Sequence, residues 1–220
     1  MNKYELINYN DYPLVKIGNY VFLIDSGCPW SISFTRLANV IINGIDCTAK
    51  FRYMPHHMTG NDMNNAFGCI VAGFIGYDIL RSFSVLEVDL ANNTVMFGNS
   101  DKEKANVCPL VNLKTNVLLN GRPAIAFLDT GAHIVMVQNK SLLNNANYIG
   151  TCVEESNAGA FTLNKYKSLL QISTISKEVD VLEHNGRMPS MPGIDLYFGL
   201  NQFASEYYVL DFKENIFYFK

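Results

Sequence analysis

The sequence predicts a mostly β fold made of two similar halves, and three observations support this prediction. An apolar segment that ends in Asp, a hydroxyl residue and Gly occurs twice, at 21–27 and at 125–131. A short strand and a tight turn precede each copy, and a strand–turn–strand pattern closes each half of the chain. Asp25 and Asp129 lie about half of the 220-residue chain apart, which indicates an internal duplication.

Each Asp is expected at the end of the second strand of a hairpin. The dipeptides Gly18-Asn19 and Asn120-Gly121 stand before the two apolar segments, and both tolerate the positive φ angles of a two-residue hairpin turn. Because the four residues before each Asp are all apolar, we expect these strands to be buried on both faces.

A second motif, two apolar residues followed by Gly, occurs downstream of each Asp, at 74–76 and at 197–199. A short amphipathic helix is expected after each of these glycines, followed by a strand–turn–strand unit. The last such unit, at 207–219, is rich in Tyr and Phe and is expected to form an interlobe or barrel strand.

The boundary between the two halves is expected near residue 100. The segment 100–106 holds the densest run of charged residues and is typical of a linker. We therefore predict an N-terminal lobe at 1–100 and a C-terminal lobe at 101–220. Two further short helices are expected, at 35–39 and at 138–145.

The composition argues against several classes of protein. Hydrophobic residues make up 49% of the chain and charged residues 17%, which is typical of a globular protein rather than a disordered one. The net charge of −3 and the lack of a Lys/Arg cluster argue against a nucleic-acid partner. No apolar run approaches the roughly 20 residues of a spanning helix, and the first residues lack a signal-peptide core. A soluble cytoplasmic protein with no membrane partner is therefore expected.

The five cysteines are odd in number, widely spaced and without a CxxC pair. Free thiols in a reducing compartment are therefore favoured over a disulfide framework or a zinc site. His56 and His57 are adjacent rather than spaced as zinc ligands, and we expect them on the surface or in a flap. His133 lies two residues after Gly131, where a packing or supporting role is favoured over catalysis. No metal and no cofactor is expected.

The repeated Asp triplet is hard to explain as an accident. One such triplet is expected by chance in roughly one chain in ten of this length, and a turn-forming Asp would account for one copy. It does not account for two copies that both follow a fully apolar strand. Because a buried strand that delivers a carboxylate costs desolvation free energy, both positions are interpreted as functional.

Two carboxylates placed face to face can hydrolyse a peptide bond without a metal. Because adjacent negative charges repel, such a pair shares one proton. The ionised partner can take a proton from water while the protonated partner donates to the substrate carbonyl. The glycines are expected to let the backbone turn sharply where a side chain would clash. The hydroxyls of Ser26 and Thr130 are expected to hydrogen-bond between the two loops.

The Asp-Ser-Gly triplet at 25–27, the Asp-Thr-Gly triplet at 129–131 and the apolar-apolar-Gly motifs resemble those of the pepsin and retropepsin families of aspartic peptidases. This resemblance implies two pseudo-symmetric β-barrel lobes of the acid-protease type, an interlobe cleft that binds an extended peptide, and a catalytic pair formed by Asp25 and Asp129. Each half is close to the size of one retropepsin subunit, so the chain resembles a fused, duplicated retropepsin that would work as a monomer. The residues implied to support the active-site loops are Ser26, Gly27, Thr130 and Gly131.

One position departs from the family pattern in each half. Pepsins usually carry a hydroxyl residue directly after the Gly, whereas this chain has Cys28 and Ala132 there. Retropepsins carry Ala at this position, so the second half fits their pattern and the first half is unusual. Trp30 follows closely and is expected in the core or in a pocket wall.

The resemblance also implies a flap that covers the cleft. The loops between each Asp and its downstream Gly motif differ in length, so the working flap is not assigned to one half. The candidate substrate-binding residues of the flap are Thr59, Gly60, Ala158 and Gly159.

Three functions are compatible with the sequence. The favoured one is an endopeptidase that acts on a peptide or protein substrate. The second is a catalytically inactive acid-protease fold that binds a peptide or protein, and the third is an unrelated β-rich structural protein. Both triplets keep the Asp, the hydroxyl and the Gly, which an inactive copy would be free to lose. Carboxylates too far apart for one water to bridge would exclude the peptidase hypothesis.

Overall fold

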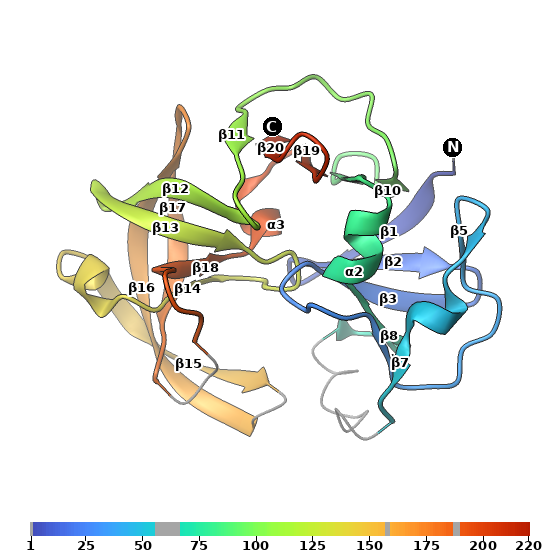
Figure 1. Ribbon diagram of the computed structural model, residues 1–220. Helices are drawn as coiled ribbons and strands as arrows, with labels where there is room; N and C mark the ends of the chain where they lie inside the picture. The colour runs from blue at the N-terminus through green and yellow to red at the C-terminus, as the bar shows by residue number, and fades with distance from the viewer. Residues whose placement is uncertain (1, 56–66, 157–158, 187–189) are drawn as a thin grey trace.

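The computed structural model describes residues 2–55, 67–156, 159–186 and 190–220 (Figure 1). Strands joined by tight turns dominate these residues, which confirms the predicted mostly β fold. In Figure 1 the strands of the first half lie on the right, and β12 to β18 of the second half lie on the left. None of the described helices is long and apolar enough to cross a membrane.

The strands of the first half are β1 (Tyr4–Tyr9), β2 (Tyr12–Ile17), β3 (Tyr20–Asp25), β4 (Ile32–Ser33), β5 (Ile41–Ile42), β6 (Ile45–Asp46), β7 (Arg52–Tyr53), β8 (Gly73–Gly76), β9 (Val85–Asp89) and β10 (Thr94–Phe97). Those of the second half are β11 (Cys108–Pro109), β12 (Lys114–Leu119), β13 (Arg122–Leu128), β14 (Val135–Val137), β15 (Asn147–Ser156), β16 (Gly159–Ile172), β17 (Ile175–Glu183), β18 (Leu196–Phe198), β19 (Tyr207–Asp211) and β20 (Ile216–Phe219). The described helices are the 3-10 helices η1 (Thr48–Lys50) and η2 (Lys140–Leu143) and the α-helices α2 (Tyr77–Ser82) and α3 (Leu200–Phe203).

Six strands of the second half close into a barrel. They follow the order β12-β13-β18-β14-β17-β16, and β16 pairs back onto β12 through Leu118 with Gln171 and Leu119 with Leu170. β15 continues the sheet beyond β16 as an edge strand. Closure lets β12 and β16 satisfy each other's backbone groups and buries the side chains of Leu119 and Leu170 inside the barrel.

The strands β1 to β4 and β7 to β10 of the first half belong to an eleven-stranded sheet of order β11-β20-β19-β9-β10-β1-β2-β3-β8-β4-β7. The C-terminal hairpin β19–β20 enters this sheet beside β9, where Glu87 lies opposite Val209. The aromatic C-terminal segment therefore joins the two halves of the chain. Among the described residues no strand pairing closes this sheet into a second barrel.

The two predicted hairpins have the expected turns. Strands β2 and β3 are joined by two residues, of which Gly18 has φ 59°. Strands β12 and β13 are joined by Asn120 and Gly121, with φ 52° and 76°. Left-handed angles of this kind explain the Gly and Asn at these positions. Each second strand then pairs in parallel with the strand of the downstream Gly motif, β3 with β8 and β13 with β18.

Helices follow the Gly motifs as predicted, in the form of α2 and α3. Within the predicted segment 138–145 the chain forms only the 3-10 helix η2. The helix predicted at 35–39 is absent, and that prediction was wrong. Side-chain hydroxyls bind the backbone N–H groups of Ala38 and Val40, and Asn39 adopts a left-handed φ of 56°, so this segment cannot continue as a helix.

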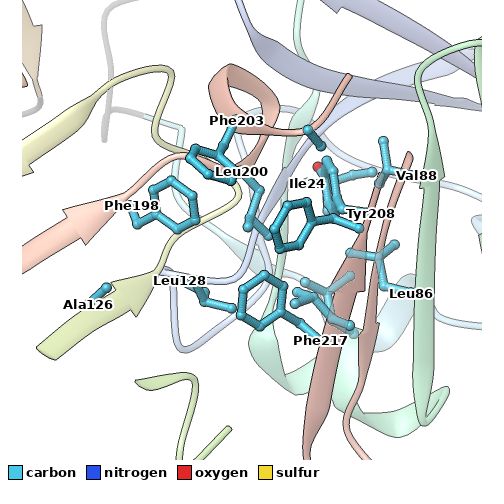
Figure 2. Packing of buried hydrophobic residues seen from close by; sticks show 14 of the residues in the cluster. Ile24, Leu86, Val88, Ala126, Leu128, Phe198, Leu200, Phe203, Tyr208 and Phe217 are labelled. Carbon is cyan, nitrogen blue, oxygen red and sulfur yellow. The ribbon is translucent and has the colours of Figure 1, made fainter. Parts of the chain in front are cut away.

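One buried cluster underlies both Asp-containing loops. Figure 2 shows Ile24 and Leu128, the residues directly before the two aspartates, among buried side chains of both halves. Phe198 lies in the same cluster, as do Tyr208 and Phe217 of the C-terminal hairpin. Each fully buried side chain of this size contributes roughly 1.5–3 kcal/mol to folding. The two loops therefore stand on one continuous core.

Candidate active site

The two aspartates singled out by the repeat meet at one point. Asp25 is the last residue of β3, Asp129 directly follows β13, and each carboxyl group lies against the glycine of the opposite triplet. The backbone N–H of Cys28 donates to Asp25 Oδ1 at 2.9 Å, and that of Gly131 donates to Asp129 Oδ1 at 3.0 Å. Both aspartates are half-buried. Each half of the chain thus supplies one carboxyl group to a single site.

The glycines of the two triplets make room for this approach. A Cβ atom on Gly27 would lie 2.6 Å from Cγ of Asp129, and one on Gly131 would lie 2.5 Å from Cγ of Asp25. Neither glycine has a left-handed φ, so the expected sharp turn is not the reason for them. Each glycine is needed because a side chain would push away the carboxyl group of the opposite half.

The hydroxyl residues of the triplets link the two loops by four buried hydrogen bonds. The backbone N–H of Ser26 donates to Thr130 Oγ1 at 2.9 Å, and the N–H of Thr130 donates to Ser26 Oγ at 3.0 Å. The Ser26 hydroxyl donates to the carbonyl of Leu128, and the Thr130 hydroxyl to that of Ile24, both at 2.9 Å. Each hydroxyl therefore accepts one bond and donates one bond across the contact between the halves.

The surroundings raise the pKa of both carboxyl groups. Burial is the largest cause for each, and for Asp25 the charge of Asp129 is the second cause. Backbone N–H groups of Gly27 and Cys28 act in the opposite direction on Asp25, yet its pKa remains well above the usual range. The pair therefore keeps a shared proton at pH values where free aspartates would both be ionised.

The residues directly after the two triplets give the pair no side-chain hydrogen bond. The Cys28 thiol donates to the carbonyl of Trp30 at 3.0 Å, and burial raises its pKa to about 11, followed by the charge of Asp25. Ala132 has no polar side-chain atom. Trp30 itself is 49% exposed and stacks with Arg52, whose guanidinium lies 3.9 Å from the ring centroid, so it lies at the surface rather than in the core.

Asp78 supports the first Asp-containing loop, and sequence reasoning did not single it out. Its Oδ1 accepts hydrogen bonds from the backbone N–H and the hydroxyl of Ser31, at 2.8 and 2.6 Å. The same hydroxyl accepts from the N–H of Gly76 at 2.9 Å. The signal lay two residues after the Gly of each apolar-apolar-Gly motif, where the two halves carry Asp78 and Asn201, although Asn201 instead donates to Asn8 at 3.2 Å.

A pocket of about 330 Å³ opens beside Asp129. Strand β2 of the first half contributes one aromatic residue, and most other lining residues come from the second half. The pocket is mainly apolar but contains two carboxyl groups and an imidazole. Its lining residues are Tyr12, Gly27, Asp129, Gly131, Ala132, His133, Ile134, Met136, Glu154, Met191 and Tyr197.

Most of the predicted flap residues cannot be placed relative to this site. Thr59, Gly60 and Ala158 lie outside the described residues, as do the adjacent histidines at 56–57. Gly159 is the first residue of β16, which forms a long hairpin with β15. In the described part of the chain no group of three His, Cys, Asp or Glu side chains is arranged to hold a metal ion.

Comparison with known proteins gives little further information. No protein-family model matches the sequence, and no curated protein matches it. The chain is similar in structure to the solution structure of the simian foamy virus (mac) protease. That match has 17% sequence identity and a TM-score of 0.31, and it covers 40% of this chain and 89% of the viral one. A similarity this low carries no argument about function.

The hydrogen bonds of the Thr130 hydroxyl lead to a prediction about stability. Thr130→Val removes a hydroxyl that bonds Ser26 and Ile24, and each buried backbone group left without a partner costs about 1–3 kcal/mol. Thr130→Ser keeps the hydroxyl and should cost much less. Urea unfolding of both variants tests this expectation. Equal destabilisation by the two substitutions would contradict this expectation, because Ser keeps the hydroxyl that Val lacks.

The raised pKa values predict a pH-dependent stability difference. The folded protein holds a proton on the pair more tightly than the unfolded chain, so wild-type stability falls as the pH rises from about 4 through the folded pKa. Asp25→Asn removes the part of this loss that comes from Asp25, while the burial of Asp129 still contributes. The free energy of unfolding of Asp25→Asn should therefore rise relative to that of the wild type as the pH rises from about 4 to about 7. Below pH 3 the difference should be constant, and the exposed Asp101→Asn control should show no such trend.

Proposed function

We propose that this chain is an aspartic endopeptidase in which Asp25 and Asp129 form the catalytic pair. The observation that carries the proposal is that two half-buried carboxyl groups from equivalent positions of a repeat each lie against the glycine of the opposite triplet, both with raised pKa values. The adjoining pocket supports it, because a substrate side chain can lie next to the reacting atoms.

In the proposed reaction the pair holds one proton and one negative charge. The ionised carboxylate removes a proton from a water molecule, whose oxygen adds to the carbonyl carbon of the substrate. The protonated carboxyl group donates its proton to the carbonyl oxygen, which gives a tetrahedral diol. The diol then loses a proton to the pair while the amide nitrogen gains one, the C–N bond breaks, and an acid and an amine leave. The raised pKa values extend this shared-proton form to a higher pH than free aspartates would allow.

Further parts of the proposal concern the organisation of the enzyme. We propose lobes at 1–100 and 101–220 of the acid-protease type, with the substrate between them. Hairpin β15–β16 is the proposed flap of the second half, supported by Glu154 of β15 in the pocket wall. The five free thiols support a reducing location such as the cytoplasm, which cell fractionation would test.

Loss of either carboxylate should abolish cleavage. Asp25→Asn and Asp129→Asn each replace a group that must gain and lose a proton, so turnover of a peptide mixture should fall by about a hundredfold to ten-thousandfold. Cleavage products counted by mass spectrometry give the readout, with Asp101→Asn as the exposed control.

The same assay separates the peptidase from an inactive peptide-binding protein. A binding protein would retain peptides without cleaving them, and wild type and both variants would then behave alike. Substantial turnover in either Asn variant would also count against the assignment.

The proposed enzyme works as a monomer, because both aspartates come from one chain. Its specific activity should therefore stay constant as the protein is diluted, and sedimentation should show a single chain at the same concentrations. Activity that falls on dilution together with a sedimenting dimer would contradict this prediction.

A further inference from the structure

The pocket beside Asp129 contains one carboxylate that the proposed reaction does not use. Glu154 lies on β15 with 19% of its side chain exposed, and its Oε1 is 3.5 Å from Nε2 of His133. The same oxygen accepts a weak hydrogen bond from the Cys152 thiol at 3.8 Å. Within the described residues, Oε2 of Glu154 makes no hydrogen bond or ion pair. The carboxylate is thus shielded from water on one side and only partly satisfied.

The rest of the pocket does not neutralise this charge. Burial, and then the charges of Glu154 and Asp129, raise the pKa of the Tyr12 hydroxyl, so Tyr12 stays neutral. The Tyr12 ring packs against the imidazole of His133 at a centroid distance of 4.6 Å, with the two ring planes tilted by 40°. Lys165 of the neighbouring strand is ion-paired with Asp180 at 2.6 Å.

The electrostatics of the pocket therefore favour a positive charge. The catalytic pair carries one negative charge and Glu154 a second, whereas His133 is the only described lining side chain that can carry a positive charge. Ile134, Met136 and Met191 line the same pocket as these two negative groups. A long side chain with an apolar stem and a cationic head matches such walls, because the stem packs while the head keeps polar contacts.

We propose that this pocket is a side-chain subsite for lysine or arginine next to the scissile bond, with Glu154 as the residue that determines the preference. This inference rests on the proposed peptidase function and names its substrate class. An apolar side chain would cover Glu154 and leave its charge desolvated without a cationic partner, which is unfavourable. An acidic side chain would meet two negative charges. A cationic head instead gains a charge-assisted hydrogen bond to the free oxygen of Glu154.

The test uses peptides that differ at one position on either side of the scissile bond, with Lys, Met or Glu there. Wild type should cleave the Lys peptide with a higher kcat/KM than the Met peptide in one of the two series. Glu154→Gln should lower this Lys-to-Met ratio by about tenfold to a hundredfold, the value of a charge-assisted hydrogen bond. Glu154→Lys should reverse the preference towards Glu. The control Glu178→Gln, whose side chain is 69% exposed, should keep the wild-type ratio.

Two results would overturn the inference while leaving the proposed function intact. One is a Lys-to-Met ratio that Glu154→Gln does not change, and the other is wild-type discrimination against Lys in both series. If wild type cleaves no peptide, the proposed function fails. Calorimetric binding of the same peptides to Asp25→Asn then tests whether the pocket prefers a cationic side chain. Tighter binding of the Lys peptide that Glu154→Gln removes would then support the subsite, and equal binding of all peptides would overturn it.

Discussion

The exchange of hydrogen bonds between Ser26 and Thr130 is the contact on which the site depends. Each hydroxyl binds a backbone N–H and a backbone carbonyl of the opposite loop, so four polar groups are satisfied in a buried place. Without this exchange the loops would bring unpaired donors and acceptors into the interior. With it, the two triplets have one relative position, and the carboxyl groups of Asp25 and Asp129 follow from that position.

Bringing two carboxyl groups together is itself unfavourable, since burial and mutual charge raise their pKa values. The continuous core under both loops offsets this cost. Ile24 and Leu128 precede the aspartates and pack with side chains from both halves (Figure 2). Pairing of β19 with β9 then fastens the second half to the sheet of the first. The unfavourable free energy of burying the two carboxyl groups is thus offset by apolar packing and strand pairing around them.

The two halves are alike at the aspartates and differ away from them. Asp78 of α2 binds Ser31 beside the first loop, whereas its counterpart Asn201 of α3 binds Asn8 instead. The pocket lies beside Asp129, and β15 brings Glu154 to its wall. A symmetric pair of carboxyl groups does not distinguish the two directions in which a peptide could bind. A charged pocket on one side only would give a bound peptide a preferred orientation.

Local patterns in the sequence determined the hairpins and the Gly motifs, and the repeated triplet singled out Asp25 and Asp129. These features depend on turn chemistry and on apolar runs, which neighbouring residues dictate. The segment 35–39 shows the limit of such reasoning, because hydroxyl groups distant in the sequence bind its backbone N–H groups and prevent the predicted helix.

Only the tertiary structure decided what the triplet glycines do and what surrounds the pair. Gly27 and Gly131 are required by the carboxyl group of the opposite half, a contact that no local pattern contains. The approach of Glu154 to His133 depends on where the long hairpin β15–β16 folds relative to the Asp129 loop. Contacts of this kind join residues far apart in the chain, so they are fixed by packing and strand register rather than by local sequence.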